Sequence, residues 1–361
     1  MQILAIETSC DETSLAILEA NGPAEQPLVK VETNIISSQI ALHAPFGGVV
    51  PNIAKREHIK NLPELYQQIT AEWRKEKGTD LTLDLIAVTV GPGLEPALWA
   101  GIEFAKSLGE KLKKPIIGVN HLEGHLYSFL LTQKTATSNT KTGQSALNAY
   151  PSFPAIALLV SGGHTILIKM DSLTEWKKLG ETRDDAVGEA FDKVARMLGL
   201  PYPGGPEIEK LAKEGNPKAI NFPRPMLAEK NYEFSFSGLK TAVLYHIQDQ
   251  TLSPSPSTLN PNQKSDIASS FQAAAFEVLA KKTIRATQEF SARSILLSGG
   301  VAASKTLRQA LSTASESLEI QLYVPDFAFN TDNAAMIGIA GYISFLQNKN
   351  LALKADSTLN L

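Results

Sequence analysis

The chain has 361 residues, of which 43% are hydrophobic and 20% are charged, and this length predicts two domains with buried cores. The 34 basic and 37 acidic residues give a formal net charge of −3, which argues against a protein that binds nucleic acid over its whole surface. A single cysteine excludes a disulfide framework and a cysteine-based zinc site. Without a signal-peptide pattern or a run of ~18 apolar residues, we expect a cytoplasmic protein that does not contact a membrane.

Two segments of the chain predict β-hairpins. Apolar runs at residues 3–6 and 14–18 flank a short polar turn, and runs at 155–160 and 166–168 flank another. Two strands around a small polar turn are the ordinary sequence pattern of a hairpin.

Two further segments predict a buried strand, a glycine turn and a helix. The apolar run 85–90 precedes a helical pattern at 97–112, and the run 294–297 precedes one at 304–311. This arrangement presents backbone N–H groups to an anion. Each hairpin comes before its strand–turn–helix unit in the same order, which predicts an internally duplicated α/β protein with a cleft between two similar lobes.

The sharpest local pattern is His121-Leu122-Glu123-Gly124-His125. Histidines four residues apart on a helix lie one turn apart on the same face, so both imidazoles can bind one metal ion. Glu123 lies about 200° around the helix from His121 and cannot be a third ligand beside them. The alternative interpretation is a pair of surface histidines.

Asp332 is the best candidate for a third metal ligand. It lies between the apolar run 327–329, interpreted as a strand, and an apolar helix at 334–345. A carboxylate at such a junction can face a cleft, and two histidines with one carboxylate suit Fe(II) or Zn(II) with open coordination positions. The alternative is that Asp332 is an ordinary helix N-cap.

The turn containing Thr8, Ser9 and Asp11 is similar to a phosphate-binding hairpin, and residues 161–163 form the matching turn in the second half, although each is also compatible with a plain turn. Asp185, Glu189 and Asp192 have helical spacing on one face.

Polar or proline-rich composition predicts exposed loops at 132–152 and 249–266, and we expect the tail from residue 350 to fray.

Motifs along nearly the whole chain resemble those of the TsaD family, which makes N(6)-threonylcarbamoyladenosine in tRNA. The matching segments are IETSCDET at 6–13, GGVVP at 47–51, GPGL at 91–94, the histidine motif at 121–125, LVSGGHT at 159–165, GEAFDK at 188–193, YPGGP at 202–206, FSGLKT at 236–241, SGGVA at 298–302 and TDNA at 331–334. The resemblance implies the actin-like ATPase superfamily fold, called ASKHA, with two lobes around a central cleft. The expected lobes are residues 1–118 completed by 334–361, and residues 119–333 containing the metal motif and the nucleotide-binding turns.

The resemblance also assigns roles to individual residues. It implies one divalent metal, with Fe(II) favoured and Zn(II) possible, held by His121, His125 and Asp332, and a catalytic acidic residue, Asp11. The residues implied to bind the nucleotide part of the substrate are Leu159, Val160, Ser161, Gly162, Gly163, Asp192, Gly205 and Ser304. Ser304 stands where the family usually has asparagine, whose side chain reaches further.

The activity implied by the resemblance is acyl transfer from threonylcarbamoyl-adenylate to the N(6) amine of the adenosine 3′ to the anticodon, with release of AMP. The implied partners are tRNA and the TsaB and TsaE proteins, or a second copy of the chain if it behaves like organellar relatives. Alternatives are an ATP-dependent sugar- or acetate-kinase-like phosphotransferase, a metalloprotease and a non-catalytic nucleotide-binding regulator. The histidine motif lacks the adjacent glutamate of metalloproteases.

Overall fold

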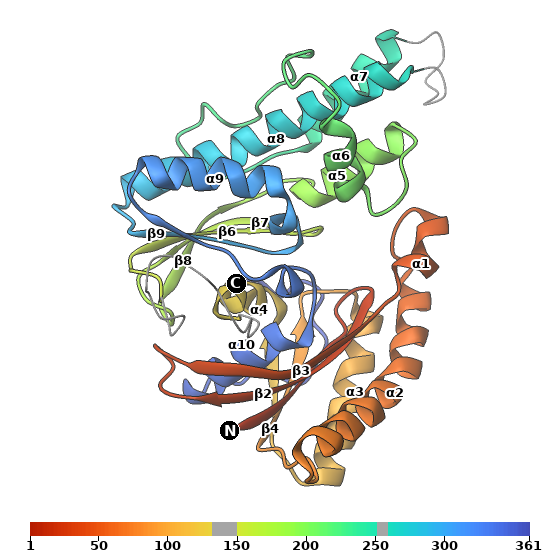
Figure 1. Cartoon of the computed structure of the whole chain (residues 1–361), viewed down its shortest axis with the longest axis vertical. Coiled ribbons are helices and arrows are strands. Elements are labelled where there is room, and N and C mark those ends of the chain that lie inside the picture. The colour runs from red at the N-terminus through yellow and green to blue at the C-terminus, as the bar shows by residue number, and fades with distance from the viewer. Residues whose placement is uncertain (132–149, 251–258) are drawn as a thin grey trace. The chain divides into compact units, whose positions relative to one another are not determined.

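A computed structural model describes residues 1–131, 150–250 and 259–361 (Figure 1). The chain divides into two compact units. The first consists of residues 1–39, 51–152 and 325–361, and the second of residues 40–50 and 153–324. Most of the loop predicted at 132–152 lies outside the described residues.

The first unit is built on a five-stranded sheet with the order β3-β2-β1-β4-β5. Its strands are β1 (Gln2–Glu7), β2 (Glu12–Asn21), β3 (Leu28–Ser38), β4 (Leu85–Gly91) and β5 (Ile116–Asn120). β1 pairs antiparallel with β2 and parallel with β4, so the first predicted hairpin is confirmed.

Helices cover both faces of this sheet. The helical segments of the unit are α2 (Pro51–Lys77), α3 (Glu95–Leu112), α4 (His121–Tyr127), η2 (Ser128–Leu130), η5 (Phe327–Phe329) and α10 (Ala334–Leu346). Leu4 and Ile6 of β1 pack in one core with residues of α2 and α3. Side chains alternate between the faces of a strand, and on the other face Ala87 meets α10, where a Cβ on Gly341 would lie 2.6 Å from the Ala87 Cβ. Glycine at this position lets α10 approach the sheet closely.

The second unit repeats this plan. Its strands are β6 (Ala155–Val160), β7 (Thr165–Met170), β8 (Trp176–Glu181), β9 (Ser294–Ser298) and β10 (Gln321–Tyr323), and its helical segments are α1 (Ile40–His43), η1 (Ala44–Phe46), α5 (Val187–Met197), α6 (Gly204–Ala212), α7 (Ser237–Gln250), α8 (Pro261–Glu289), η4 (Gly300–Ala303) and α9 (Lys305–Ser317). The sheet order β10-β9-β6-β7-β8 is the first sheet's order read in reverse. β6 pairs antiparallel with β7 and parallel with β9, as β1 pairs with β2 and β4. The predicted duplication is confirmed.

Three local expectations are wrong. Residues 327–329 form the 3-10 helix η5 rather than a strand. Residues 261–266 are helical, because the Asn260 side chain caps α8 in a capping box with Gln263. The C-terminal tail is held against the first unit, where the backbone N–H of Asp356 donates to the Val90 carbonyl at 2.8 Å.

The helix α4 lies in the first unit. The sequence instead predicts a C-terminal lobe of residues 119–333 that contains the histidine motif, and this boundary differs from the observed unit. The physical reason for the difference is packing, since a Cβ on Gly124 would lie 3.0 Å from Ile337 of α10. Among the described helices, none is long and apolar enough to cross a membrane.

Candidate metal centre and nucleotide-binding turns

The helix α4 presents both histidines of the sequence motif. It begins directly after β5, where the Asn120 side chain accepts a hydrogen bond from the Leu122 N–H at 2.8 Å and caps the helix. His121 and His125 follow one turn apart, with ring centroids 4.7 Å from each other. Both side chains are buried, so the interpretation as surface histidines is wrong.

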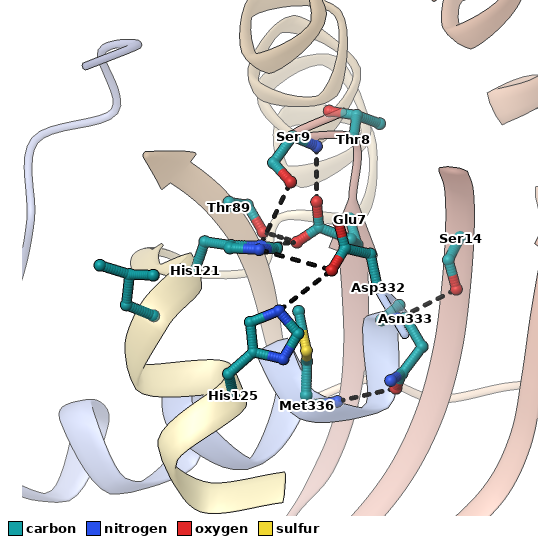
Figure 2. Close-up of polar contacts among 12 residues, drawn as sticks. Glu7, Thr8, Ser9, Ser14, Thr89, His121, His125, Asp332, Asn333 and Met336 are labelled. Carbon is teal, nitrogen blue, oxygen red and sulfur yellow. Dashed lines mark hydrogen bonds and ion pairs between the residues drawn. The ribbon is translucent and has the colours of Figure 1, made fainter. Parts of the chain in front are cut away.

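Asp332 faces the two imidazoles (Figure 2). Its Oδ1 lies 3.0 Å from Nε2 of His125 and 3.5 Å from Nε2 of His121. The N-cap of α10 is Asn333, whose side chain accepts from the Met336 N–H at 3.1 Å, so Asp332 is not that cap. The nearest possible ligand atoms of the three residues all lie within 4.8 Å of one another.

The donor set fits a divalent metal ion. Two imidazole nitrogens and one carboxylate oxygen leave coordination positions open and are ligands that both iron and zinc accept. Glu123 points elsewhere and forms an ion pair with Lys349, in agreement with its expected position around the helix. Within the described part of the chain, the buried Nδ1 of His125 has no hydrogen-bond partner. These three residues can therefore hold a metal ion.

A buried carboxylate, Glu7, lies behind His121. Its Oε2 is 3.2 Å from Nδ1 of His121 and accepts a hydrogen bond from the Thr89 hydroxyl at 2.6 Å. Its Oε1 accepts from the Ser9 N–H at 2.5 Å, and the Ser9 hydroxyl also lies 3.2 Å from Nδ1 of His121.

Burial and charge oppose each other at this pair. Burial alone would lower the pKa of His121, but the carboxylates of Asp332 and Glu7 outweigh it and raise this pKa to about 9. Burial would likewise raise the pKa of Glu7, but the charge and hydrogen bond of His121 hold it below its usual value. In the metal-free protein, Glu7 and His121 therefore form a buried ion pair.

Asp11 lies in the turn between β1 and β2, where its side chain is buried and its backbone carbonyl accepts from the Gln39 N–H at 2.9 Å. The neighbouring Glu12 interacts electrostatically with both Asp11 and Asp332. Burial and these two carboxylates raise the pKa of Glu12 to about 10. The turn thus brings acidic side chains toward the metal ligands.

The predicted nucleotide-binding residues gather in the second unit near the carboxyl ends of two parallel strands. Leu159 and Val160 are the buried last residues of β6, and Ser161 begins the turn to β7. A Cβ on Gly162 or Gly163 would meet nothing within 4 Å, so the backbone of this turn is open to an approaching group.

The helices α5, α6 and α9 carry the other predicted residues. The Asp192 carboxylate on α5 accepts from the Gly204 N–H at 2.7 Å, next to Gly205 at the start of α6. Ser304 accepts from the Leu307 N–H at 3.3 Å as the N-cap of α9. Its hydroxyl also donates to Glu209 of α6 at 3.2 Å.

One expectation about α5 is wrong. Asp185 lies before this helix, which begins at Val187, and does not share a helical face with Glu189 and Asp192. Its carboxylate instead forms ion pairs with Lys193 at 2.8 Å and Lys240 at 2.7 Å.

Two carboxylates beside the candidate site residues were not predicted from the sequence. Glu7 lies beside the metal ligand His121, and Glu209 lies beside Ser304. The sequence pattern indicates only a turn residue at Glu7, although an acidic residue directly after the apolar run 3–6 is a signal of a buried carboxylate. Glu209 was missed too, and its helical spacing of four residues from Gly205 was the available signal.

Comparison with solved structures supports the duplicated fold. A full-length HypF in its phosphate- and nucleotide-bound form matches 98% of this chain with a TM-score of 0.55 and 12% identity. T. kodakarensis HypF matches 96% with a TM-score of 0.58 and 15% identity. The chain spans about half of each, 47% and 48% respectively. The chain thus has a duplicated α/β fold of the actin-like ATPase type, and it carries a His-His-Asp group that can hold a metal.

Sequence comparison then gives the family. Residues 30–339 match the model of TsaD, tRNA N6-adenosine threonylcarbamoyltransferase. Proteins with that name from Moorella thermoacetica and Thermosipho melanesiensis are 48% and 46% identical, over 96% and 100% of this chain and 92% and 100% of their own lengths. The chain belongs to the TsaD family.

Proposed function

We propose that this protein transfers the threonylcarbamoyl group of threonylcarbamoyl-adenylate to the N(6) amine of the adenosine 3′ to the anticodon, in tRNAs that read codons beginning with adenine. The observation that carries the proposal is the family match over residues 30–339. A sugar- or acetate-kinase-like phosphotransferase has no need of the His-His-Asp group, which favours the acyltransferase over that alternative.

The adenylate part of the donor binds in the second unit under this proposal. The open backbone at Gly162 and Gly163 offers N–H groups to a phosphate. Asp192 and Gly205 lie at the start of α6, and Ser304 caps α9. Leu159 and Val160 fix the position of the turn because they are buried in β6.

Asp11 acts on the incoming amine. The exocyclic amine of adenine is a poor nucleophile, so it has to be oriented and relieved of a proton as it attacks the carbamoyl carbon. The Asp11 carboxylate accepts that proton while the new C–N bond forms and the bond to the phosphate oxygen breaks. AMP then leaves with the electron pair of the broken bond.

The metal bound by His121, His125 and Asp332 is a divalent ion, with Fe(II) favoured and Zn(II) as the alternative. When bound, it supplies a template that orients the donor, together with Lewis-acid stabilisation of negative charge. The protein is cytoplasmic and works with TsaB and TsaE, or as a homodimer if it resembles organellar relatives.

A transfer assay with preformed donor tests the proposal. The purified chain is incubated with threonylcarbamoyl-adenylate and tRNA, with and without TsaB and TsaE, and the digested tRNA is analysed for the modified nucleoside. We expect modification by the wild-type chain and its loss in Asp11→Asn, while Asp80→Asn, which alters an exposed carboxylate, serves as the matched control. Phosphorylation of a sugar or acetate by ATP without any tRNA modification would refute the proposal. Full transfer by Asp11→Asn would refute the role of Asp11.

A further inference from the structure

Glu7 is a fully buried carboxylate that is not one of the three candidate ligands. It lies at the end of β1, and Figure 2 shows it next to the His121 ring. A carboxylate without solvent contact is costly to fold unless it is paired and hydrogen-bonded. Its position therefore needs a reason beyond packing.

Two donors besides the histidine fix the Glu7 carboxylate in place. The Ser9 backbone N–H donates to Oε1 at 2.5 Å and the Thr89 hydroxyl donates to Oε2 at 2.6 Å. Both oxygens are thus engaged by groups on the ordered β1 turn and on β4. The carboxylate cannot turn away from His121 without breaking these hydrogen bonds.

The geometry assigns a different task to each ring nitrogen of His121. Nδ1 faces Glu7 at 3.2 Å, whereas Nε2 faces Asp332 at 3.5 Å. An ionised carboxylate only accepts hydrogen bonds, so Nδ1 carries a hydrogen and the lone pair of the neutral ring lies on Nε2. Nε2 of His121 and Nε2 of His125 therefore face the same atom, Oδ1 of Asp332. The distance from this oxygen to Nε2 of His125 is 3.0 Å.

We propose that Glu7 is the positioning residue of the metal centre, holding His121 in the tautomer and ring orientation that present Nε2 to the metal. Carboxylates behind ligating histidines commonly do this and also make the imidazole a stronger donor. The inference rests on the proposed metal site. It makes the centre asymmetric, because within the described residues His125 has no corresponding partner at Nδ1.

Glu7→Gln separates positioning from packing because it keeps the shape of the side chain. The glutamine side chain has one acceptor oxygen and one NH2 group. The Ser9 N–H, the Thr89 hydroxyl and the protonated Nδ1 of His121 all donate to Glu7 in the wild type. Either the NH2 faces the Ser9 N–H, or it faces the Thr89 and His121 side and forces Nδ1 to accept. In the second case the hydrogen of the neutral ring moves to Nε2 and blocks the ligand atom.

The experiment measures Zn²⁺ binding by the purified full chain in the absence of tRNA and donor. Dissociation constants are determined by competition with a chelator over a series of pH values and extrapolated to the pH-independent limit. We expect Glu7→Gln to weaken the limiting dissociation constant by about 10-fold to 100-fold. The absorption spectrum of the Co²⁺-loaded variant should also change, since the ring orientation affects the coordination geometry.

Glu123→Gln is the matched control, because Glu123 is also buried and lies on α4, but pairs with Lys349 rather than with a candidate ligand. It should leave the Zn²⁺ dissociation constant within about twofold of the wild type, as expected for a site without shared partners. If Glu7→Gln does not fold, Thr89→Val removes one donor to Glu7 and should weaken binding by about threefold to tenfold.

Each result decides something different. An unchanged limiting dissociation constant and Co²⁺ spectrum in folded Glu7→Gln would overturn the role of Glu7 while leaving the metal site and the proposed activity intact. If Glu7→Gln does not fold, unchanged Zn²⁺ binding by Thr89→Val would overturn it instead. Equal weakening by Glu123→Gln would show a general effect of lost buried charge and overturn it as well. A wild-type chain that binds no Zn²⁺ would overturn the inference together with the metal site.

Discussion

A proton and a metal ion compete for Nε2 of His121, so metal affinity should depend strongly on pH. The carboxylates of Asp332 and Glu7 outweigh burial and raise the pKa of His121 to about 9. At pH 7, two units below this value, about 99% of metal-free molecules carry the proton. A metal must displace it, which costs about 2.7 kcal/mol at about 1.4 kcal/mol per unit.

The expected effect follows directly from this competition. The apparent dissociation constant of Zn²⁺ should be about 100-fold weaker at pH 7 than its limiting value, and should tighten about tenfold between pH 7 and pH 8. Chelator competition at half-unit steps of pH measures the slope. Calorimetry in two buffers of different ionisation enthalpy counts the released protons, and about one should leave from His121 per metal bound.

The stability of the metal-free protein should show the opposite trend. Because the pKa of His121 is higher in the folded protein than in the unfolded chain, protonated His121 contributes to the free energy of unfolding. This contribution is fully present below the unfolded-state pKa of 6.5 and is lost as pH rises through the folded-state pKa of about 9. Urea unfolding of the apoprotein should therefore show decreasing stability over this range. A metal affinity that is flat between pH 7 and pH 8, with no proton released, would refute the assignment of a charged His121.

Three further predictions concern individual side chains. Leu158→Ala removes a fully buried side chain from the core of the second unit and should lower the free energy of unfolding by about 2–5 kcal/mol in urea, whereas a loss under 1 kcal/mol would contradict that packing. Asn333→Ala removes the N-cap of α10 and should cost about 1 kcal/mol, measured by thermal unfolding against an Asn350→Ala control in an exposed position. Zn²⁺ at 100 times its dissociation constant should raise the free energy of unfolding of the wild type by about 2.7 kcal/mol, and should raise that of Asp332→Ala much less. An equal increase in both proteins would exclude Asp332 as a ligand.

The fold was largely predictable because its repeated elements are local in sequence. The apolar runs of β1, β2, β6 and β7 lie beside their own turns, so each hairpin is visible in a few residues. The assignment of α4 to a unit was not visible, since it depends on the packing of Gly124 against Ile337, a residue more than 200 positions away.

The candidate metal ligands were predictable for a different reason. The spacing of His121 and His125 is a helical pattern, and Asp332 was the acidic residue expected opposite them. Glu7 could not be assigned in the same way, because its role depends on the approach of β1 to α4 and of Thr89 to its carboxylate. Local patterns predict residues on one element, whereas contacts between elements require the folded chain.

The separation of the ligands along the chain has a consequence for biosynthesis. His125 and Asp332 are 207 residues apart in sequence, and α10 follows immediately after Asp332. A ribosome adding about 5–20 residues per second exposes the histidines long before the carboxylate. The nascent polypeptide thus cannot bring all three ligands together until residues 153–324 of the second unit have been synthesised, which makes loading of the metal a step that follows synthesis of that unit.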